Sequence, residues 1–358
     1  MLSRSAAVIR AQAAVFAKTG APSEVMHVCT RQLPAVSGDG VLVRMLAAPI
    51  NPSDLNQIEG TYPVAARFTD GLAVGGNEGV GEVLQVGSHV TDLSAGDWVV
   101  PSHGGLGTWA THVHAPRSQL ARIPREWRST LSPLHVATLR VNQSTAYRLL
   151  RDFGTLQPGD WVVQNAGNSA VGRCVVQVAR ALGLRTASVV RDLREQPGRL
   201  ELLRRELRAL GGDIVASEGE VTKGALRQVQ AKLALNCVGG RSGGLLARVV
   251  QPGGWLVTYG GMARQPLALP TAPLVFGDVR AAGFWMHRWY ERQEDCAERD
   301  EMWRWLLRLA EQGGLSLPPV ESVVWREDMR EQEVSALVRR AVEWQAGAKR
   351  AFVFGTQA

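Results

Sequence analysis

Residues 160–172 constrain the fold more than any other part of the sequence. The apolar run at Trp161, Val162 and Val163 is typical of a parallel strand that is covered on both faces. Gly167 and Gly172 then allow a tight turn and a close approach of the backbone to a bound group. Apolar residues follow at helical spacing, at Val171, Val175, Val176, Val178 and Ala179. The sequence therefore predicts a strand, a glycine turn and a helix in succession.

Such a turn is a candidate dinucleotide site. The first turn of a helix offers free N–H groups and a partial positive charge to a pyrophosphate. The match to the Gly-x-Gly-x-x-Gly pattern is imperfect, because Asn168, Ser169 and Ala170 occupy its middle positions. A plain turn between strand and helix that binds nothing is the alternative interpretation.

The same half of the chain alternates strands and helices. An amphipathic helix is expected at residues 199–210, where Gly211 and Gly212 end it. Further strands are expected at residues 186–190, 213–216, 233–238 and 254–260. This alternation predicts an α/β fold with a parallel, doubly wound sheet.

The two ends of the chain have a different character. Residues 12–47 alternate like β-structure, and a strand is expected at residues 41–47. After Gly313 the sequence becomes β-like again, up to a terminal strand expected at residues 350–354. Since 358 residues suffice for roughly two domains, we expect the last residues to return to the domain that the first residues form.

Charge and hydropathy limit the classes of partner that the protein is expected to have. The formal net charge of +7 suits a phosphorylated cofactor, a coenzyme A ester or an acidic carrier protein, or is simply a solvated basic surface. The Lys and Arg residues are dispersed rather than gathered in one stripe, so we expect no nucleic acid partner. No apolar run reaches the ~18 residues of a transmembrane helix, so no membrane span is expected.

The first residues have the composition of a targeting segment. Residues 1–11 contain Arg and Ser, and no acidic residue precedes Glu24. This pattern is typical of a short mitochondrial presequence, and a short basic tail is the alternative.

A family resemblance covers nearly the whole chain. It rests on ordered segments, which together are far more specific than one glycine turn, at residues 45–54, 75–80, 105–109, 164–169, 235–240, 257–262 and 283–285. Through them the sequence resembles the medium-chain dehydrogenase/reductase superfamily, and within it the zinc-free, quinone oxidoreductase-like mitochondrial trans-2-enoyl thioester reductases. The resemblance implies a GroES-like, partly β-barrel catalytic domain at residues 12–140 and 316–358. A Rossmann domain that binds NADPH is then inserted at residues 141–315.

The resemblance also bears on metal. Zinc-dependent relatives carry Gly-His-Glu where this chain has Gly76, Asn77 and Glu78, and an amide is a poor zinc ligand. The four-cysteine lobe of those relatives is absent, and the cysteines form no Cys-x-x-Cys pair. We therefore expect no metal in the site.

The implied activity is the NADPH-dependent reduction of trans-2-enoyl thioesters, carried on acyl carrier protein or coenzyme A, in mitochondrial fatty acid synthesis. Hydride goes to Cβ of the substrate and a proton goes to Cα. The resemblance further implies a homodimer in the mitochondrial matrix. A quinone or alkenal reductase of the same superfamily, or a non-catalytic NADPH-binding protein, is the alternative.

Tyr62 is the expected proton donor, because it follows the Asn-Pro-Ser-Asp segment where the resembling reductases carry their catalytic tyrosine. A phenol with a pKa of ~10 keeps its proton at neutral pH and can give it to a carbanion-like centre. A loop tyrosine that packs on its neighbours is the alternative. The following Pro63 departs from the family pattern and is expected to alter the local loop. In the preceding segment, two prolines are expected to delay a short helix until Ser53 or Asp54 caps it.

The remaining site residues are expected to hold NADPH. Asn142 matches a cofactor-contacting position, with a helix cap as the alternative. Arg191, with Asp192 beside it, follows a strand ~20 residues after the glycine turn, where an Arg accommodates the 2′-phosphate of NADP. Arg194 is a second candidate for that phosphate.

Other cofactor contacts follow from the resemblance alone. Gly167 stands where a serine is expected, so one hydroxyl contact is missing. Core packing is the alternative for the aromatic and Met residues of this set, and a surface position is the alternative for its lysine. The set comprises Asn168, Ser169, Ala170, Val171, Tyr259, Gly260, Gly261, Met262, Phe284, Trp285, Met286 and Lys349.

Overall fold

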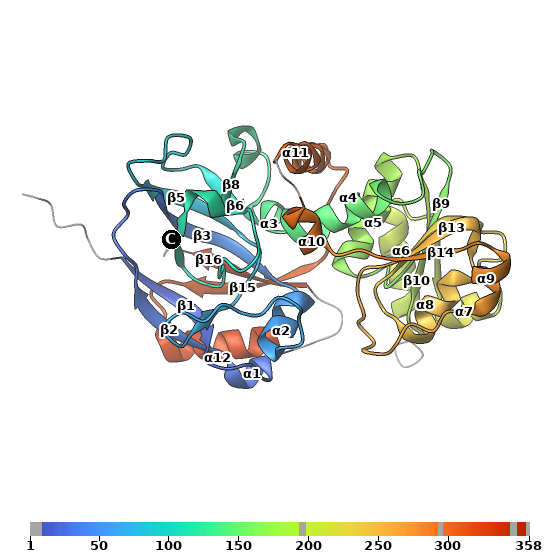
Figure 1. Ribbon diagram of the computed structural model, residues 1–358, viewed down its shortest axis with the longest axis horizontal. Helices are drawn as coiled ribbons and strands as arrows, with labels where there is room; N and C mark the ends of the chain where they lie inside the picture. The colour runs from blue at the N-terminus through green and yellow to red at the C-terminus, as the bar shows by residue number, and fades with distance from the viewer. Residues whose placement is uncertain (1–8, 193–197, 293–295, 344–348, 356–358) are drawn as a thin grey trace, which may run out of the picture. The chain divides into compact units, whose positions relative to one another are not determined.

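The computed structural model describes residues 9–192, 198–292, 296–343 and 349–355 (Figure 1). Over these residues the chain forms two compact units, one from Met1–Arg140 with Pro319–Ala358 and the other from Val141–Pro318. The first unit is rich in β-sheet, and the second alternates strands with helices. The expected α/β class, with a doubly wound sheet beside a β-rich domain, is confirmed.

The second unit is built on a parallel sheet. Its strands are β9 (Trp161–Asn165), β10 (Arg185–Val190), β11 (Ile214–Ser217), β12 (Ala231–Asn236), β13 (Val250–Thr258) and β14 (Arg280–Gly283). They lie in the order β11-β10-β9-β12-β13-β14, and the paired neighbours run parallel. This is the strand order of Rossmann sheets, which bind dinucleotides where the order reverses, here between β9 and β12.

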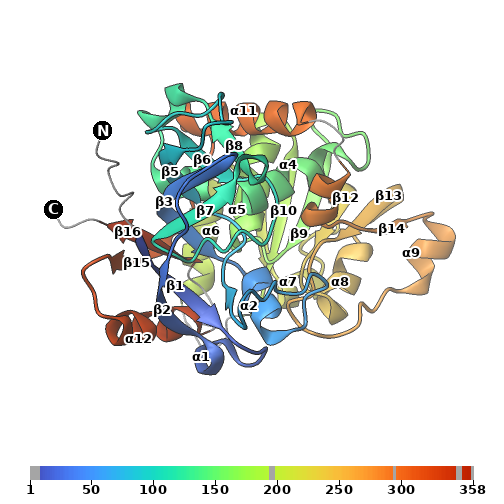
Figure 2. The ribbon, with the colours of Figure 1, turned by 60° about the vertical axis from the view of Figure 1, so that its left-hand side comes forward.

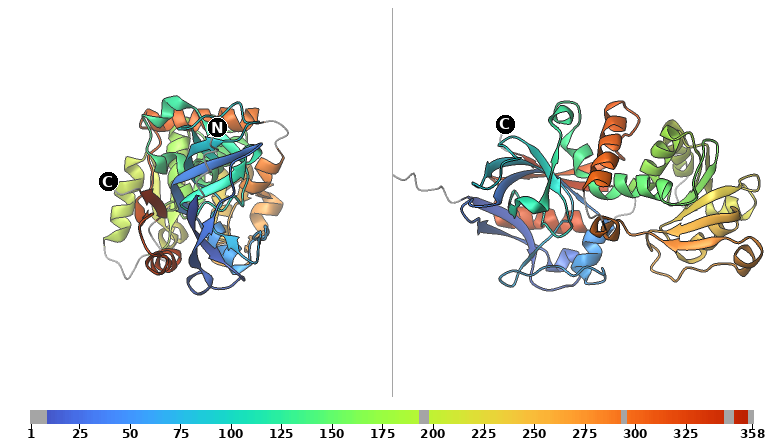
Figure 3. Two further views of the ribbon diagram at one scale, coloured as in Figure 1. Left: turned by 90° about the vertical axis from the view of Figure 1, so that its left-hand side faces the viewer. Right: turned by 45° about the horizontal axis from the view of Figure 1, so that its top comes forward.

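Helices cover both faces of this sheet (Figure 3). They include α5 (Ala170–Ala181), α6 (Arg199–Ala209), α7 (Glu218–Thr222), α8 (Gly240–Ala247) and α9 (Thr271–Phe276). Val189 packs in a cluster with Leu246 of α8, whereas the next residue, Val190, packs with Leu207 of α6. Since neighbouring side chains of a strand point to opposite faces, α6 and α8 lie on opposite sides. Coverage on both faces explains why these strands are continuous apolar runs in the sequence.

The second unit also holds a group of helices outside this sheet. They are α4 (Ser144–Arg151), α10 (Met286–Glu291) and α11 (Ala297–Glu311). A short π-helical segment, η3 (Leu139–Gln143), leads from the end of the first unit into α4.

The first unit contains a large mixed sheet and a smaller one (Figure 2). Its strands are β1 (Arg10–Phe16), β2 (His27–Gln32), β3 (Gly40–Ile50), β4 (Ala73–Val74), β5 (Val80–Val86), β6 (Trp98–Pro101), β7 (His112–Pro116), β8 (Leu120–Ile123), β15 (Val320–Arg326) and β16 (Lys349–Gly355). The large sheet has the order β15-β16-β3-β5-β6-β8, with β7 also paired to β3, and the smaller has the order β2-β1-β4.

Helical segments of the first unit are short, apart from α12. They are α1 (Pro22–Val25), α2 (Pro52–Glu59), α3 (Pro133–Ala137), α12 (Glu331–Val342) and the 3-10 turns η1 (Arg117–Gln119) and η2 (Arg125–Arg128). The expectation of β-structure throughout the residues after Gly313 was wrong for α12. This helix buries Val334, Val338 and Ala341, a helical spacing that docks it on the core of the first unit.

The terminal strand β16 ties the end of the chain to the first unit. It pairs antiparallel with β3, from Arg350 opposite Ile50 to Val353 opposite Ala47, and parallel with β15. Phe352 of β16 is fully buried and packs edge-on against Trp109 and Trp325, with ring centroids 5.4 and 5.6 Å apart. Such aromatic packing holds the last strand in the core and brings its first residue, Lys349, beside the end of β3.

The described part of the chain starts with a strand. β1 begins at Arg10 and pairs with β2, so Arg10 and Ala11 belong to a strand, while residues 1–8 of the expected presequence lie outside the described residues. None of the helices in the described part of the chain is long and apolar enough to cross a membrane.

Candidate active site

The glycine turn joins β9 to α5 and leaves no room for larger residues. A Cβ at Gly167 would lie 2.5 Å from Cβ of Ser188, and a Cβ at Gly172 would lie 2.6 Å from the carbonyl oxygen of Ala166. Ala166 itself has a φ of 48°, in the left-handed region. The expected serine is therefore absent from position 167 for a steric reason, because Ser188 of the neighbouring strand fills that space.

The start of α5 is built to receive an anion. Ser169 caps the helix, since its hydroxyl accepts a hydrogen bond from the Gly172 N–H at 3.1 Å. The N–H groups of Ala170 and Val171 have no carbonyl acceptor within the helix, as at the start of any α-helix. Asn168, Ser169, Ala170 and Val171 are all half-buried rather than enclosed. The residues present thus fit a pyrophosphate at this helix start.

Two buried asparagines, which the sequence analysis missed, join the strands on either side of the point where the strand order reverses. Asn165 at the end of β9 donates to the side-chain oxygen of Asn236 at the end of β12, over 2.7 Å. Asn165 also accepts from the Cys237 N–H at 2.9 Å, and Asn236 accepts from the Gly239 N–H at 3.0 Å. Amides at the carboxyl ends of two expected strands were the available signal. The hydrogen bonds of Asn165 and Asn236 fix the rim of the nucleotide crevice.

The segment after β13 approaches the same rim. Tyr259 donates its N–H to the Asn236 carbonyl, and Met262 donates its N–H to the Cys237 carbonyl, both at 2.9 Å. A Cβ at Gly260 would lie 3.2 Å from Cβ of Cys237, whereas a Cβ at Gly261 would meet nothing within 4 Å. Met262 is 45% exposed. A side chain at position 260 would therefore be tightly packed against Cys237, whereas position 261 is open to a ligand.

The Tyr259 side chain and Cys237 are both held in their neutral forms. The Tyr259 hydroxyl is buried and makes no hydrogen bond with the described residues. Burial, with the neighbouring Cys237 thiol, raises the pKa of Tyr259 well above its ordinary value. Burial also raises the pKa of Cys237 to about 11, so this residue is a thiol and not a reactive thiolate at neutral pH.

Arg191 and Asp192 follow β10 directly, and both are exposed. The Asp192 carboxylate accepts a hydrogen bond from the N–H of Gly219, at the start of α7, over 3.0 Å. This hydrogen bond draws the carboxylate toward α7. Arg194 lies outside the described residues.

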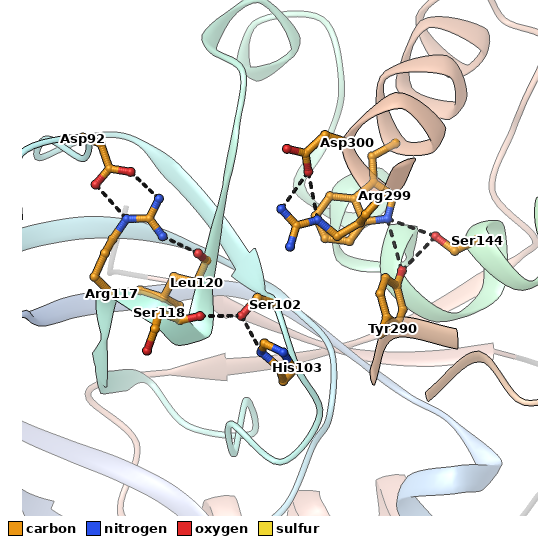
Figure 4. A network of polar contacts seen from close by, with 11 residues as sticks. Asp92, Ser102, His103, Arg117, Ser118, Leu120, Ser144, Tyr290, Arg299 and Asp300 are labelled. Atoms are coloured by element: carbon orange, nitrogen blue, oxygen red, sulfur yellow. Dashed lines mark hydrogen bonds and ion pairs between the residues drawn. The ribbon is translucent and has the colours of Figure 1, made fainter. Parts of the chain in front are cut away.

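The segments that contain Asn142 and Trp285 are joined through Ser144. Asn142 is 6% exposed and lies within η3, so the helix-cap alternative for it was wrong. The Ser144 hydroxyl accepts hydrogen bonds from the Tyr290 hydroxyl of α10 and the Trp303 indole N–H of α11, each at 3.1 Å (Figure 4). The start of α4 is thereby fixed against α10 and α11.

The expected acyl-pocket residues pack in different ways. Phe284 contacts Phe153 edge-on, with ring centroids 6.2 Å apart, so its ring belongs to the packing of the second unit. Met286 is buried, and Trp285 is half-buried with the Arg288 guanidinium 5.5 Å from its ring centroid. Of the three side chains, Trp285 is the one with both an exposed part and a polar neighbour.

In the first unit, α2 lies directly before the candidate tyrosine in the chain and fixes where its loop begins. The helix begins at Pro52 with Asn51 as its cap, and Asp54 closes a capping box by accepting the Asn51 N–H at 2.8 Å. The expected cap at Ser53 or Asp54 was therefore wrong, because proline is well tolerated in the first turn of a helix. α2 ends at Gly60, whose φ of 79° turns the chain toward Tyr62.

Tyr62 lies directly after this helix end. The N–H groups of Thr61 and Tyr62 both donate to the Asn56 carbonyl, at 2.9 and 3.1 Å. The Tyr62 side chain is half-buried. The loop thus starts from a fixed point, with the phenol neither enclosed in the core nor fully in solvent.

A polar network surrounds α2, and the sequence analysis named Asp54, Asn77, Glu78 and Lys349 without recognising that they belong together; at its centre is Asn77. Its side-chain amide donates to Asp54 at 2.7 Å and to Gln57 at 2.9 Å, and its oxygen accepts the Gly105 N–H at 2.8 Å. Hydrogen bonds within the protein therefore occupy both ends of the amide, at the position where zinc-dependent relatives carry histidine. Over the described ranges, no group of three or more His, Cys, Asp or Glu side chains is placed to hold a metal ion.

Lys349 joins this network from the far end of the chain. Its ammonium donates to the Asn51 side-chain oxygen, and the Asn51 amide donates to the Glu78 carboxylate at 2.6 Å. Glu78 is fully buried and Asp54 is 1% exposed. Burial raises the pKa of Asp54, while hydrogen bonds from Asn77 and Asn51 and the charge of Lys349 act against that rise. Lys349 is therefore the cation that compensates buried carboxylates of the first unit.

Comparison with known proteins places this geometry among reductases. Residues 37–125 match the alcohol dehydrogenase GroES-like domain. The chain is 43% identical over 330 residues to the mitochondrial enoyl-[acyl-carrier-protein] reductase of Rattus norvegicus, covering 90% of this chain and 85% of the relative.

Solved structures give the same result. The mitochondrial 2-enoyl thioester reductase Etr1p/Etr2p heterodimer from Candida tropicalis superposes with a TM-score of 0.89 at 31% identity, covering 96% of this chain and all of that one. A structure described as a complex of Etr1p with NADP and crotonyl-CoA superposes with a TM-score of 0.88, also at 31% identity and with 96% of this chain covered.

Proposed function

The chain belongs to the mitochondrial enoyl-[acyl-carrier-protein] reductases, zinc-free members of the medium-chain dehydrogenase/reductase superfamily, and we propose that it reduces trans-2-enoyl thioesters with NADPH. The observation that carries the proposal is the 43% identity that extends over 90% of the chain. The complex of Etr1p with NADP and crotonyl-CoA supports both the cofactor and the substrate class. The names of the relatives support a role in mitochondrial fatty acid synthesis. The matrix is our proposal for where in the mitochondrion the protein acts.

The reaction saturates the double bond conjugated to the thioester. Bound NADPH supplies the hydride that Cβ of the substrate receives. Tyr62 gives its phenolic proton to Cα, which becomes carbanion-like as Cβ is reduced. A phenol suits this task, because with a pKa of ~10 it stays protonated at neutral pH until a stronger base forms beside it.

The second unit is the proposed NADPH-binding part. The N–H groups of Ala170 and Val171 bind the pyrophosphate, with Asn168 and Ser169 beside it. Arg191 binds the 2′-phosphate, which is supported by the hydrogen bond that draws Asp192 toward Gly219. The nicotinamide end of NADPH is proposed to contact the remaining cofactor residues, which are Asn142, Tyr259, Gly260, Gly261, Met262, Phe284, Trp285 and Met286.

The substrate is proposed to reach the enzyme on acyl carrier protein or coenzyme A. Both carriers present a phosphate-bearing, anionic group to the protein, and a net charge of +7 attracts such partners. Lys349 was expected to contact NADPH. Because it hydrogen-bonds to Asn51 and lies near Asp54, we propose a structural role for it in the first unit instead.

We further propose a homodimer formed through the second unit. β14 lies at the edge of the parallel sheet; after Arg280 its residues are small, and the strand is mostly exposed. In the preceding helix α9, Val275 is 64% exposed and Phe276 is 86% exposed. An unpaired strand edge next to exposed apolar side chains favours association with a second copy.

The function is tested by following NADPH consumption by the purified protein with crotonyl-CoA, with a quinone and with no substrate. The expected result is turnover with crotonyl-CoA and formation of butyryl-CoA, with NADH far less effective than NADPH. Turnover with the quinone alone would instead assign the protein to quinone reduction. Binding of NADPH without turnover of either substrate would indicate a non-catalytic protein.

A further inference from the structure

Gln57 connects the buried polar network of the first unit to the loop that carries Tyr62. Its side-chain oxygen accepts a hydrogen bond from the Asn77 amide at 2.9 Å. Its side-chain nitrogen donates to the carbonyl of Val64, which follows Tyr62 closely in the chain, at 3.2 Å. We propose that Gln57, held by Asn77, is a positioning residue that fixes the Tyr62 loop for proton transfer. The inference rests on the proposed function.

The loop is held on both sides of Tyr62. Its beginning is anchored by the two N–H groups that donate to the Asn56 carbonyl. Thr61, Pro63 and Ala65 are exposed, whereas Tyr62 and Val64 are half-buried and Ala66 packs against the core of the first unit. The hydrogen bond from Gln57 to Val64 therefore supplies an anchor on the other side of Tyr62. With both sides anchored, the loop has a defined path through the tyrosine.

The anchor itself is held firmly, because hydrogen bonds fix Asn77 to α2 and to the loop at Gly105. Its backbone N–H and its side-chain amide both donate to Asp54, at 3.1 and 2.7 Å, and its oxygen accepts the Gly105 N–H. Asp54 is buried and forms part of the capping box of α2. Hydrogen bonds in a network of this kind, shielded from water, are stronger than exposed ones. Gln57 thus transfers the rigidity of a buried network to an exposed loop.

The expected effect on the reaction follows from the geometry that proton transfer needs. A misplacement of a reacting group by about 1 Å costs up to ~10²-fold in rate. Loss of the whole general acid costs ~10²-fold or more, which sets the upper limit for a residue that acts only through it. We therefore expect Gln57→Met, which keeps the length of the side chain and removes both hydrogen bonds, to lower kcat about tenfold.

A matched control exists in the same unit. Gln12 is also half-buried, donates its side-chain nitrogen to a carbonyl, that of Met329 at 2.7 Å, and accepts the Trp325 indole N–H at 2.8 Å. Gln12→Met therefore removes the same kinds of hydrogen bond away from the Tyr62 loop. A second variant, Gln57→Glu, keeps an acceptor for Asn77 but cannot donate to Val64.

The first experiment measures kcat with crotonyl-CoA for Gln57→Met, Gln57→Glu and Gln12→Met, each with Tyr62 intact and with Tyr62→Phe. Both Gln57 variants are expected to lose about tenfold when Tyr62 is present and to lose nothing further when it is Phe, with the KM for NADPH unchanged. Gln12→Met is expected to keep the wild-type kcat. An equal loss in both backgrounds, or a loss equal to that of Gln12→Met, would overturn the positioning role.

The second experiment measures amide hydrogen exchange at Thr61, Tyr62 and Val64 of the free protein, which requires no reaction; Pro63 has no amide hydrogen. Exchange is expected to be faster in both Gln57 variants and unchanged in Gln12→Met. Unchanged exchange in the Gln57 variants would overturn the anchoring itself. An inactive wild-type protein would overturn the proposed function, and the positioning role with it, whereas normal activity of the Gln57 variants would overturn the positioning role alone.

Discussion

Lys349 donates a hydrogen bond to the side chain of Asn51, although the two residues are 298 positions apart in the sequence. The contact exists because β16 pairs antiparallel with β3, which places the start of one strand beside the end of the other. Asn51 passes the interaction on to the buried Glu78 carboxylate at 2.6 Å. The chain therefore brings a positive charge from its last strand to the acidic residues near α2.

We predict that Lys349→Met destabilises the free protein by about 1–3 kcal/mol at neutral pH, because buried acceptors lose a charged partner. Burial raises the pKa of Asp54, so the folded protein favours the neutral form of this carboxyl group. As pH rises through the raised pKa, ionisation of Asp54 lowers the free energy of unfolding. Loss of Lys349 raises the pKa further. The destabilisation should therefore be largest near neutral pH and should shrink as the medium becomes acidic enough to protonate Asp54.

The measurement for Lys349 is urea unfolding at neutral pH and at a clearly acidic pH. Lys349→Arg serves as the control and should retain most of the stability, since it keeps the charge. The same loss of stability at both pH values would show that Lys349 does not act through an ionised carboxylate.

Tyr62→Phe is predicted to lower kcat with crotonyl-CoA by ~10²-fold or more, because the phenolic proton is no longer available. NADPH affinity, measured by fluorescence titration, should be unchanged. Tyr147→Phe is a suitable control, since that ring packs on Trp305 at 5.2 Å in the second unit and has no proposed role in the reaction. Wild-type turnover in the Tyr62 variant would exclude Tyr62 as the proton donor.

Two glycines of the second unit are predicted to respond differently to alanine. Gly172→Ala would place a Cβ 2.6 Å from the Ala166 carbonyl and 2.8 Å from the Gly167 Cα, so the start of α5 must shift. Overpacking of this kind costs about 1–3 kcal/mol. Gly261→Ala meets no protein atom within 4 Å and should leave stability unchanged.

The informative comparison is between thermal unfolding and NADPH binding in these two variants. Gly172→Ala should lower both the Tm and the affinity for NADPH. Gly261→Ala should weaken only NADPH binding, because the open space at this position is proposed to admit the cofactor. Unimpaired NADPH binding by Gly261→Ala would remove Gly261 from the proposed site.

Local patterns predicted the parts of this fold that depend on neighbours in the sequence. The strand, glycine turn and helix at residues 160–172 are present as β9, the turn at Gly167 and α5, because apolar runs and glycines act over a few residues. The helix α12 was missed, although Val334, Val338 and Ala341 have helical spacing. The charged residues at both of its ends, such as Glu331, Glu333, Arg339 and Arg340, gave the apolar stripe little weight.

The polar network near α2 was beyond reach of such patterns. Asn77 contacts Asp54 and Gln57 across 23 and 20 positions, and Lys349 contacts Asn51 across the whole chain. These partners meet because of strand pairing and the position of α2, which a local pattern does not encode. The same limit applies to Asn165 and Asn236, which are paired across 71 positions. Local patterns supplied the nucleotide turn and the family resemblance supplied Tyr62, but neither supplied the residues that hold them.

The proposed homodimer gives a prediction about one exposed side chain. Phe276 is 86% exposed at the end of α9, shortly before the edge strand β14, so in a dimer through this edge it would be covered. Phe276→Glu should place a charge in that interface and convert the protein to a monomer at micromolar concentration, as measured by sedimentation or light scattering. Val324→Glu, at a side chain that is 50% exposed on β15 of the first unit, should leave the dimer intact. Since the substitution lies outside the proposed cofactor and substrate residues, a monomeric Phe276→Glu should still bind NADPH. A wild-type protein that sediments as a monomer, or a Phe276→Glu variant that remains a dimer, would place the interface elsewhere or exclude it.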